Sequence, residues 1–428
     1  MNRKIFYVAL FTMSAFCLKA QESIPIDSCY QWATSNYPLI LRYHLIDQAE
    51  GYNLSNAAKA WIPQVTLNAK ASYQSEVTTL PLTPDLFGGK LPKGFQFPAV
   101  SKDQYQAQIE VSQQLWEGGR TRHSKEISKA TAYSERKQLD SDLYAIRERV
   151  NRLFFGCLLQ EAMIHQNEIL QQQLLNNLSR IQGMVDNGVA NSSDLQQIEV
   201  ELLQVQSQKT ELQASRQAFR LMLSQFIGKE IASESVLVLP QPEVLLSKQI
   251  LRPELLAMDA ESLLIDTQEK QIKSSRMPLL AAFVRGGVGR PGLNFLKDDF
   301  SPFYVAGMRL SWNIGSLYTL RSNRHLLQTN RSALNVKKET FLFNTHLQMT
   351  QQEIEIEKLS KLRQADQKFV TLRTDLRDVA EVKHANGVIS TADLVTEINA
   401  ESAAAQQMSI RDLQRIAAIY QYKHITNN

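Results

Sequence analysis

A nine-residue stretch occurs twice in this chain and constrains its fold more than any other feature. It reads Asn-Gly-Val-Ala-Asn-Ser-Ser-Asp-Leu at residues 187–195 and Asn-Gly-Val-Ile-Ser-Thr-Ala-Asp-Leu at residues 386–394. Each copy lies between two long polar segments that have helical patterning and no proline, so each is predicted to be the tight turn of a helical hairpin. Asn-Gly favours the left-handed backbone that ends one helix, and a Ser or Thr ahead of Asp-Leu can cap the next.

The two copies start about 199 residues apart, which is far more than the roughly 20–50-residue period of solenoid repeats. We interpret them as the product of one duplication. The 428-residue chain is therefore predicted to contain a signal peptide at residues 1–20, a first repeat at 21–240 and a second at 241–428. Each repeat is expected to hold a helix, two strands and a long helical hairpin.

The amino-terminal segment has the parts of a secretory signal. Arg3 and Lys4 form its basic start, residues 5–16 its apolar run, and Leu18-Lys19-Ala20 a cleavage site. The apolar run is too short to span a bilayer as a helix. No apolar run of about 18 residues or more follows it, so the chain is expected to be exported without a membrane-spanning helix.

Charge and cysteine content narrow the class of protein. Loss of residues 1–20 removes three basic residues and no acid, which leaves 44 basic residues against 43 acidic ones. A nearly neutral chain lacks the basic footprint of a nucleic-acid-binding protein, so no nucleic-acid partner is expected. Cys29 and Cys157 remain after cleavage, and they form either a disulfide or, as we favour, two inert buried thiols.

Four short runs alternate apolar and polar residues with a period of two, which is typical of strands with one apolar face. They cover about residues 65–73, 105–112, 280–288 and 304–313. A segment rich in proline and glycine, residues 80–98, is predicted to be a long external loop between the first two.

Long proline-free helices are predicted after each pair of strands. Residues 121–186 would form a rod of roughly 100 Å, and residues 317–385 are its counterpart. After the first turn the returning helix carries the narrow apolar seam of a coiled coil, and Gly228 is predicted to end it. One rail of that seam is Ile198, Val205, Leu212, Phe219 and Phe226.

No helical pattern is available to cover the apolar face of the four predicted strands. In water such a face is an aggregation hazard, whereas in a bilayer it can contact lipid while the polar face lines a wet lumen. The open edges of a four-stranded sheet are not tolerated in hydrocarbon. We therefore expect other copies of the chain to complete the sheet and the long helices to pack in the same ring.

The order of these motifs resembles the TolC-like outer-membrane efflux proteins, or outer membrane factors, over essentially the whole exported chain. The matching motifs include the Trp-bearing strand exits and the two turns, and they are Asn36-Tyr-Pro38, Arg252-Pro-Glu-Leu255, Pro63, Pro278, Trp116-Glu-Gly-Gly119 and Trp312-Asn-Ile-Gly315. The resemblance implies a mainly helical fold with membrane β-structure. Each copy would contribute four strands to a trimeric twelve-stranded transmembrane β-barrel that continues into a periplasmic α-helical coiled-coil tunnel.

The same resemblance implies the outer-membrane channel of a tripartite efflux or secretion system. Such a homotrimer lies in the outer-membrane lipid of a Gram-negative bacterium, with its helices projecting into the periplasm. It passively conducts substrates that it receives from an inner-membrane transporter, together with a periplasmic adaptor (membrane fusion) protein. No cofactor is expected.

The resemblance places the two turns at the periplasmic tip, where adaptor hairpins dock. The predicted docking residues are Asn187, Gly188, Val189, Leu195, Asn386, Gly387, Val388 and Leu394. Asp194 and Asp393 match an acidic position that narrows the closed entrance in some members; alternatively, each only caps its helix. Thr396 stands where a second acid would extend that ring, and Glu397 is expected to point elsewhere.

Trp116 and Trp312 are predicted to mark the periplasmic rim of the membrane, or else to pack at the strand ends. His123, His165 and His384 show no pairing typical of zinc ligands and are interpreted as solvated helix residues, so no metal site is predicted. No catalytic residue is identified, and the chain is not expected to be an enzyme.

Three alternative classes are weighed. A secreted structural or adhesive helical rod without transport activity would give no conductance in a bilayer. A periplasmic adaptor normally has one hairpin that interrupts a lipoyl-like module, whereas this chain has two hairpins and lacks that module. A lone diffusion porin would need more strands per chain and short periplasmic turns.

Overall fold

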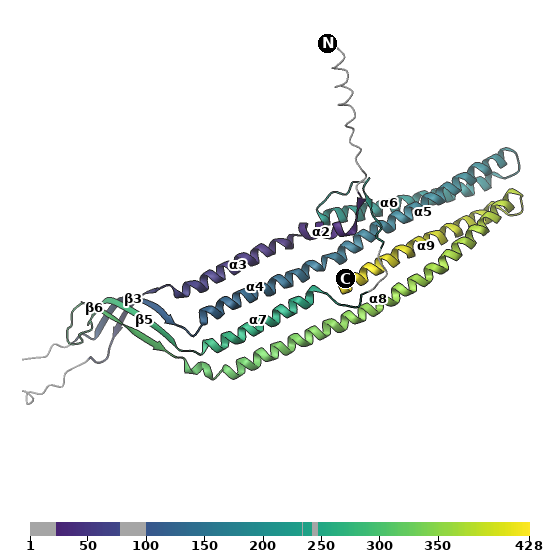
Figure 1. Cartoon of the computed structure of the whole chain (residues 1–428). Coiled ribbons are helices and arrows are strands. Elements are labelled where there is room, and N and C mark those ends of the chain that lie inside the picture. The colour runs from purple at the N-terminus through teal and green to yellow at the C-terminus, as the bar shows by residue number, and fades with distance from the viewer. Residues whose placement is uncertain (1–22, 78–99, 233, 242–246) are drawn as a thin grey trace, which may run out of the picture. The chain divides into compact units, whose positions relative to one another are not determined.

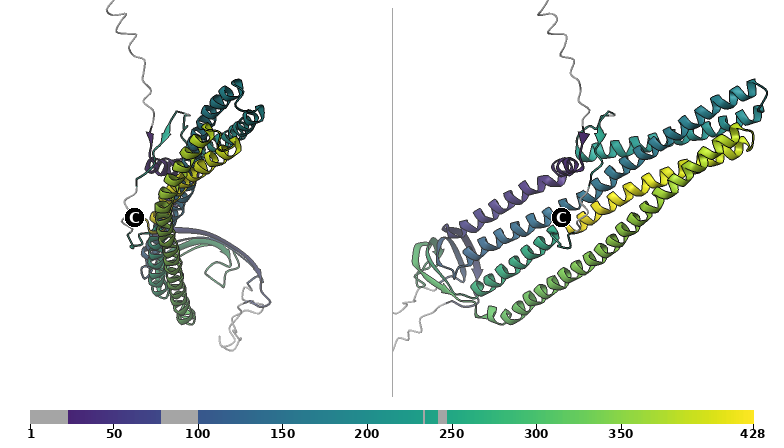
Figure 2. Two further views of the ribbon diagram at one scale, coloured as in Figure 1. Left: turned by 90° about the vertical axis from the view of Figure 1, so that its right-hand side faces the viewer. Right: turned by 45° about the vertical axis from the view of Figure 1, so that its right-hand side comes forward.

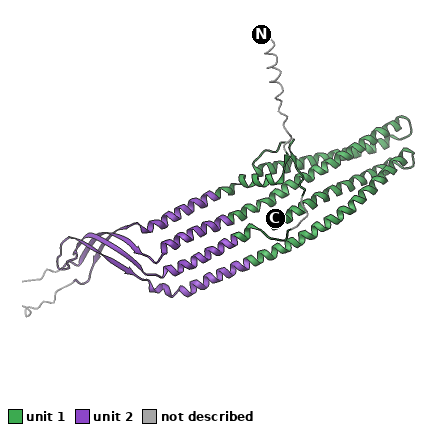
Figure 3. Cartoon of the chain, in the orientation of Figure 1, with its two compact units in different colours: residues 1–42, 138–256, 338–428 green, residues 43–137, 257–337 purple. Residues whose placement is uncertain are grey.

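The computed structural model of the chain describes residues 23–77, 100–232, 234–241 and 247–428 (Figure 1). The predicted signal peptide and the predicted loop at residues 80–98 lie outside the described residues. The chain divides into two compact units (Figure 3), of which unit 1 comprises residues 1–42, 138–256 and 338–428 and unit 2 comprises residues 43–137 and 257–337. Each unit contains segments of both predicted repeats, and the repeat boundary between residues 240 and 241 stays a prediction.

Unit 2 contains a four-stranded antiparallel sheet in the order β2-β3-β5-β6. Its strands are β2 Gln64–Tyr73, β3 Asp103–Trp116, β5 Leu279–Arg290 and β6 Ser301–Ser311. Helices flank each pair of strands. The first pair follows α3 Arg42–Ala58 and η2 Lys59–Trp61 and is followed by α4 Arg120–Tyr144. The second pair follows α7 Pro253–Ser275 and is followed by η4 Ile314–Leu317 and α8 Leu320–Ala385. All four predicted strands are confirmed.

The strand register sorts the side chains into an apolar and a polar face. One row across the sheet is Val65–Val111–Val284–Ala306, and the next row on the same face is Leu67–Ile109–Gly286–Tyr304. The row between them, Thr66–Glu110–Arg285–Val305, belongs to the opposite face because successive residues of a strand alternate sides. Leu67 is 75% exposed and Tyr304 80%, so the apolar face of the single chain stands uncovered.

Unit 1 holds the two long hairpins and a small group of shorter elements. Its segments are α2 Ile26–Asn36, η1 Pro38–Leu41, α5 Ile146–Asp186, α6 Ser192–Ile227, α9 Thr391–Thr426 and the adjoining parts of α4, α7 and α8. Two short strands that the sequence pattern does not reveal, β1 Ser23–Ile24 and β4 Val236–Leu237, pair in parallel. Gly228 ends α6 with a left-handed backbone, as predicted.

The α5–α6 hairpin lies alongside α9, as both views in Figure 2 show. Along the predicted heptad rail, Ile198, Val205 and Leu212 are buried. The rail also uses Gly156 of α5, since a Cβ there would lie 2.7 Å from a ring carbon of Phe219. These contacts confirm the coiled-coil seam.

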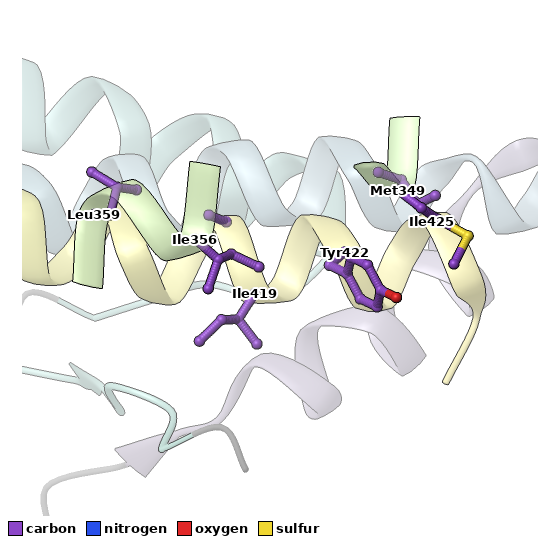
Figure 4. Close-up of a cluster of buried hydrophobic side chains, with 7 residues drawn as sticks. Met349, Ile356, Leu359, Ile419, Tyr422 and Ile425 are labelled. Carbon is purple, nitrogen blue, oxygen red and sulfur yellow. The ribbon is translucent and has the colours of Figure 1, made fainter. Parts of the chain in front are cut away.

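Near the other end of α9, its side chains interlock with those of α8 (Figure 4). Met349, Ile356 and Leu359 from α8 meet residues 419, 422 and 425 of α9 in one buried apolar cluster. The Tyr422 hydroxyl lies 3.2 Å from the backbone oxygen of Ser247. The cluster thereby ties the end of α9 to the segment ahead of α7.

The predicted 121–186 helix is interrupted at Ala145, which separates α4 from α5. At this point Tyr144 turns inward: its hydroxyl donates to the backbone oxygen of His424 at 2.7 Å. The rings of the two residues stack with centroids 4.8 Å apart, and the Arg252 guanidinium lies 5.1 Å from the Tyr144 ring centroid. The interruption is slight, since Ala145 keeps helical dihedral angles and its N–H still donates to the oxygen of Ser141 at 3.3 Å.

Cys29 and Cys157 are both buried and not bridged. Burial raises the pKa of Cys29 to about 11 and that of Cys157 to about 12, so both thiols stay protonated and unreactive. The interpretation as inert buried thiols is confirmed. Separately, within the described residues no helix combines the length and apolar character needed to cross a bilayer.

The buried His424 predicts a loss of stability in acid. Burial lowers its pKa to about 4, whereas a histidine in the unfolded chain titrates near about 6.5. Between these values the unfolded chain binds more protons, so stability falls as the pH drops through this window, by up to about 1.4 kcal/mol per unit. We expect the thermal midpoint of the purified protein to decrease as the pH is lowered from about 6.5 to about 5.

The control is His424→Phe, which keeps a ring against Tyr144 and removes the titrating group. Its thermal midpoint should depend less on pH over the same range. An equal pH dependence in the two proteins would show that His424 is not the group responsible.

Candidate functional site at the hairpin tips

The two predicted turns end their helices in the same way. Gly188 and Gly387 have left-handed backbones, with φ of 71° and 70°. The N–H of Gly387 donates to the oxygen of His384 at 2.9 Å, and the N–H of Val388 donates to that of Lys383 at 2.9 Å. The prediction that Asn-Gly ends the helix is confirmed, with the left-handed residue being the glycine.

The asparagines contribute through their side chains rather than through a left-handed backbone. Asn187 has a φ of −92°, and its amide donates to the backbone oxygen of Gly183 at 2.6 Å. Asn386 likewise donates to the oxygen of Val382 at 2.8 Å. Each asparagine side chain therefore adds a second donor to a carbonyl of the last helical turn that already accepts the asparagine's own backbone N–H.

Both aspartates cap the helix that follows the turn. The backbone N–H of Ser390 donates to Asp393 Oδ2 at 3.1 Å, and the N–H of Asp393 donates back to Ser390 Oγ at 3.2 Å. In the first turn the N-cap is Asn191 rather than the expected serine, and its N–H donates to Asp194 Oδ2 at 3.0 Å. This reciprocal pattern is a capping box.

Asp393 stays charged as well as capping. Hydrogen bonds from the Ser390 hydroxyl and backbone hold the pKa of its carboxyl below the usual value, because they stabilise the ionised form. Its side chain is exposed. The capping interpretation is thus supported for both aspartates, and a role at the entrance stays a prediction for Asp194 and Asp393.

The tips present small and apolar groups to solvent. Val189 is 72% exposed and Val388 68%, and a Cβ added at Gly188 or Gly387 would meet no atom within 4 Å. Leu195 is half-buried. This surface is open to a partner, and the docking role of these residues stays a prediction.

Leu394 requires a correction, because it does not lie on that surface. It is fully buried, in a cluster with Leu174, Val205, Ala380 and Ile398. Helix α9 packs on α5 through this face, so Leu394 supports the turn from inside and cannot offer a contact to a docking partner.

His384 is also not the solvated residue that the sequence suggested. It is buried, and its Nε2 lies 3.1 Å from Thr391 Oγ1 across the turn. Burial lowers the pKa of His384, opposed by the charge of Asp194 on the other hairpin. The duplication offered a signal: its counterpart in the first copy is Val185, which packs against the apolar cluster of Ile181 and Ile198.

Polar contacts that sequence reasoning missed join the two hairpins. Gln173 of α5 donates to Glu401 of α9 at 3.1 Å, and Asn399 of α9 donates to Glu201 of α6 at 2.7 Å. An ion pair between Arg180 and Glu381 spans 3.9 Å. They depend on which helix faces meet, which no local pattern specifies.

The residues that follow Asp393 behave as expected. Thr396 uses its hydroxyl to donate to the backbone oxygen of Ala392 at 2.8 Å. Glu397 points toward α8, where it pairs with Arg373 at 3.4 Å. Glu397, the acid one helical turn after Asp393, is therefore engaged by a cation of the neighbouring helix.

The two tryptophans lie at strand ends of unit 2. Trp116 is the last residue of β3, and Trp312 follows β6 and donates from Nε1 to the backbone oxygen of Arg276 at 3.0 Å. Both rings are about half exposed. Their position at the membrane rim stays a prediction. Among the described residues, no group of three or more His, Cys, Asp or Glu side chains is placed to hold a metal ion.

Comparison with known proteins identifies the fold. VceC, an outer membrane protein of Vibrio cholerae, is 11% identical with a TM-score of 0.65, and the match covers 94% of this chain and 96% of that one. The CmeC outer membrane channel of Campylobacter jejuni is 12% identical (TM-score 0.62; 94% and 85% covered). The open-state MtrE outer membrane channel of Neisseria gonorrhoeae is 16% identical (TM-score 0.62; 94% and 88% covered). No curated protein sequence matches the chain.

The four-stranded sheet and paired hairpins thus define the fold of an outer-membrane channel subunit, mainly helical with a short β-structured part. Residues 30–229 match the sequence model of the outer membrane efflux protein family. This match over part of the chain and the shared fold support the resemblance found from the sequence, and the location in the outer membrane stays a prediction. The matched family and structures are described as membrane proteins and channels, not as enzymes.

The left-handed turn predicts opposite effects for two glycines of the hairpins. Gly387→Ala should destabilise the protein by about 1 kcal/mol, because alanine is strained at positive φ. Gly183→Ala is the matched control, since it lies inside helix α5 with nothing within 4 Å of the added Cβ. It should be neutral or stabilising by up to about 1 kcal/mol. Denaturant unfolding of the purified variants measures both, and equal effects would contradict the assigned turn.

Proposed function

We propose that three copies of this chain form a passive outer-membrane efflux channel, which a periplasmic adaptor connects to an inner-membrane transporter. The observation that carries the proposal is the uncovered apolar face of the β2-β3-β5-β6 sheet, together with the family match over residues 30–229. A surface with Leu67, Tyr304 and Met308 each at least 74% exposed is unstable in water and suited to lipid.

The edges of the sheet supply the reason for several copies. Strands β2 and β6 are its edge strands, and each leaves one side of its backbone without a strand partner in the described chain. In hydrocarbon these groups require hydrogen bonds, which β2 of one copy and β6 of the next can exchange. Three copies of four strands would close a barrel of twelve, the number that the resemblance implies.

The hairpin tips supply a surface for the adaptor. Gly188 and Gly387 let a partner backbone approach closely, and Val189 and Val388 add exposed apolar contacts. We infer that an adaptor hairpin docks against these four residues, while buried Leu394 holds the turn in shape.

Replacing Asp393 tests the proposed channel and its entrance together. Purified wild-type protein in a planar lipid bilayer should give discrete conductance steps, and Asp393→Ala should raise the conductance because it removes an exposed charge and a cap at the entrance. Asp393→Asn separates the two effects: an amide oxygen can still accept the Ser390 N–H, so only the charge is lost.

A lower cation preference in both variants would support a constriction by Asp393. Unchanged conductance and ion preference in both would leave this residue with its capping role alone. If the wild-type protein gave no discrete conductance, a secreted structural rod would replace the channel as the proposed function.

Crosslinking tests the docking surface. A photoreactive group attached at Val388→Cys should crosslink the adaptor in cells, because the side chain at this position is exposed at the tip. The matched control is Phe343→Cys, a comparably exposed site on α8 far along the chain from the turn. Adaptor capture at Phe343 with none at Val388 would contradict docking at the tips.

A further inference from the structure

The polar face of the sheet carries a cluster of one aromatic and two basic residues, namely Phe283, Arg285 and Arg309. Glu110 of β3 pairs with Arg285 of β5, and Phe283 of β5 pairs with Gly307 of β6. Arg309 of β6 shares this face, since it lies two residues from Gly307. All belong to unit 2.

Phe283 forms the centre of this cluster. A Cβ on Gly307 would lie 3.3 Å from its ring carbons, so the ring rests over the bare backbone of β6. The Arg309 guanidinium carbon lies 4.8 Å from the ring centroid, and that of Arg285 lies 6.0 Å from it. Both distances are within the range of cation–π attraction. The phenylalanine therefore holds two cations on one side of the sheet.

The acid on this face does not neutralise the cluster. Arg309 Nη2 donates to Glu110 Oε1 at 3.1 Å, across the intervening strand β5, while the Arg309 side chain stays 53% exposed. The Nε of Arg285 is buried and has no hydrogen-bond partner among the described residues. Lys70 lies on the same face. At the polar-facing positions of the four strands, three cations thus oppose one carboxylate.

The exposed part of the Arg309 guanidinium leaves N–H donors available for a ligand. A guanidinium that stacks through its face still presents its edge, which matches the geometry of a carboxylate or phosphate. Cations on a concave, water-filled surface also raise the local concentration of anions before any contact is made.

We propose that Arg285 and Arg309, held by Phe283, form an anion-attracting site in the lumen that makes this part of the channel prefer anionic solutes. The inference rests on the proposed channel, in which the polar face lines the lumen. Three copies would repeat the site around the wall. It acts in series with Asp393 at the hairpin tips, whose negative charge has the opposite preference.

The test uses channels that carry both Asp194→Ala and Asp393→Ala, so that neither predicted entrance charge masks the selectivity of the barrel. In a planar bilayer under a potassium chloride gradient, the reversal potential should show a preference for chloride over potassium. In this background, adding Arg285→Ala and Arg309→Ala should lower the chloride-to-potassium permeability ratio by at least about threefold, the effect of one unit charge about 7 Å from an ion in water.

Two controls separate charge from structure. Arg285→Lys with Arg309→Lys keeps both charges and should retain the chloride preference. Glu110→Gln removes the opposing carboxylate and should raise the ratio, which tests the site even if the double alanine variant fails to assemble. A ratio unchanged by both the double alanine variant and Glu110→Gln would overturn the inference alone. Absence of any discrete conductance would overturn the proposed channel and this inference with it.

Discussion

Backbone hydrogen bonding at the edges of one small sheet governs the rest of this molecule. Strands β2 and β6 each have one side without a partner in the described chain, and the apolar face between them is exposed. Water does not favour that face, and hydrocarbon does not tolerate those edges. Association of copies through the edges resolves both problems at once. In the proposed assembly, copies that share a sheet would also bring together the starts of α4 and α8, because these helices follow β3 and β6 closely in the chain.

The hairpin tips show how one residue can serve the fold and the proposed function. Asp393 is needed locally, since it accepts the N–H of Ser390 at the start of α9. The same hydrogen bonds lower the pKa of its carboxyl and so keep it ionised, as the proposed role at a channel entrance requires. His384 and Leu394 serve only the inside of the turn, and their burial leaves Val388 and Gly387 as the outward surface. The turn thus has a buried side that packs on its own helices and an exposed side that a partner can reach.

Short-range patterns predicted the elements well, because the physics behind them is local. The alternation in residues 65–73 follows from a two-residue strand period, and the Asn-Gly turns follow from the left-handed backbone of glycine. Contacts between distant segments were not predictable in this way. The contact between Tyr144 and His424 joins residues 280 positions apart, and the pairing of β1 with β4 is too short to leave a periodic pattern in the sequence.

The same distinction between local and distant contacts applies to the residues of the candidate site. The turn-forming role of Gly188 and Gly387 and the capping role of the two aspartates were predicted correctly because they are set within a few residues of the turn, and the docking and entrance roles of these residues stay predictions. Leu394 was misassigned because its burial depends on α9 packing against α5. Phe283 was not singled out, since a lone aromatic residue in a weakly alternating strand gives no sign of the arginines that the register brings beside it.

The claim that copies share one closed sheet can be tested by linking its two edges. Leu67 on β2 and Tyr304 on β6 lie on the same apolar face, at opposite edges of the sheet within one chain, and each can be replaced by cysteine. In outer membranes treated with a thiol crosslinker, the account predicts covalent species of two and three chains, and no larger ones, only when both cysteines are present. A stable monomer in water without detergent, with no crosslink between chains, would contradict it.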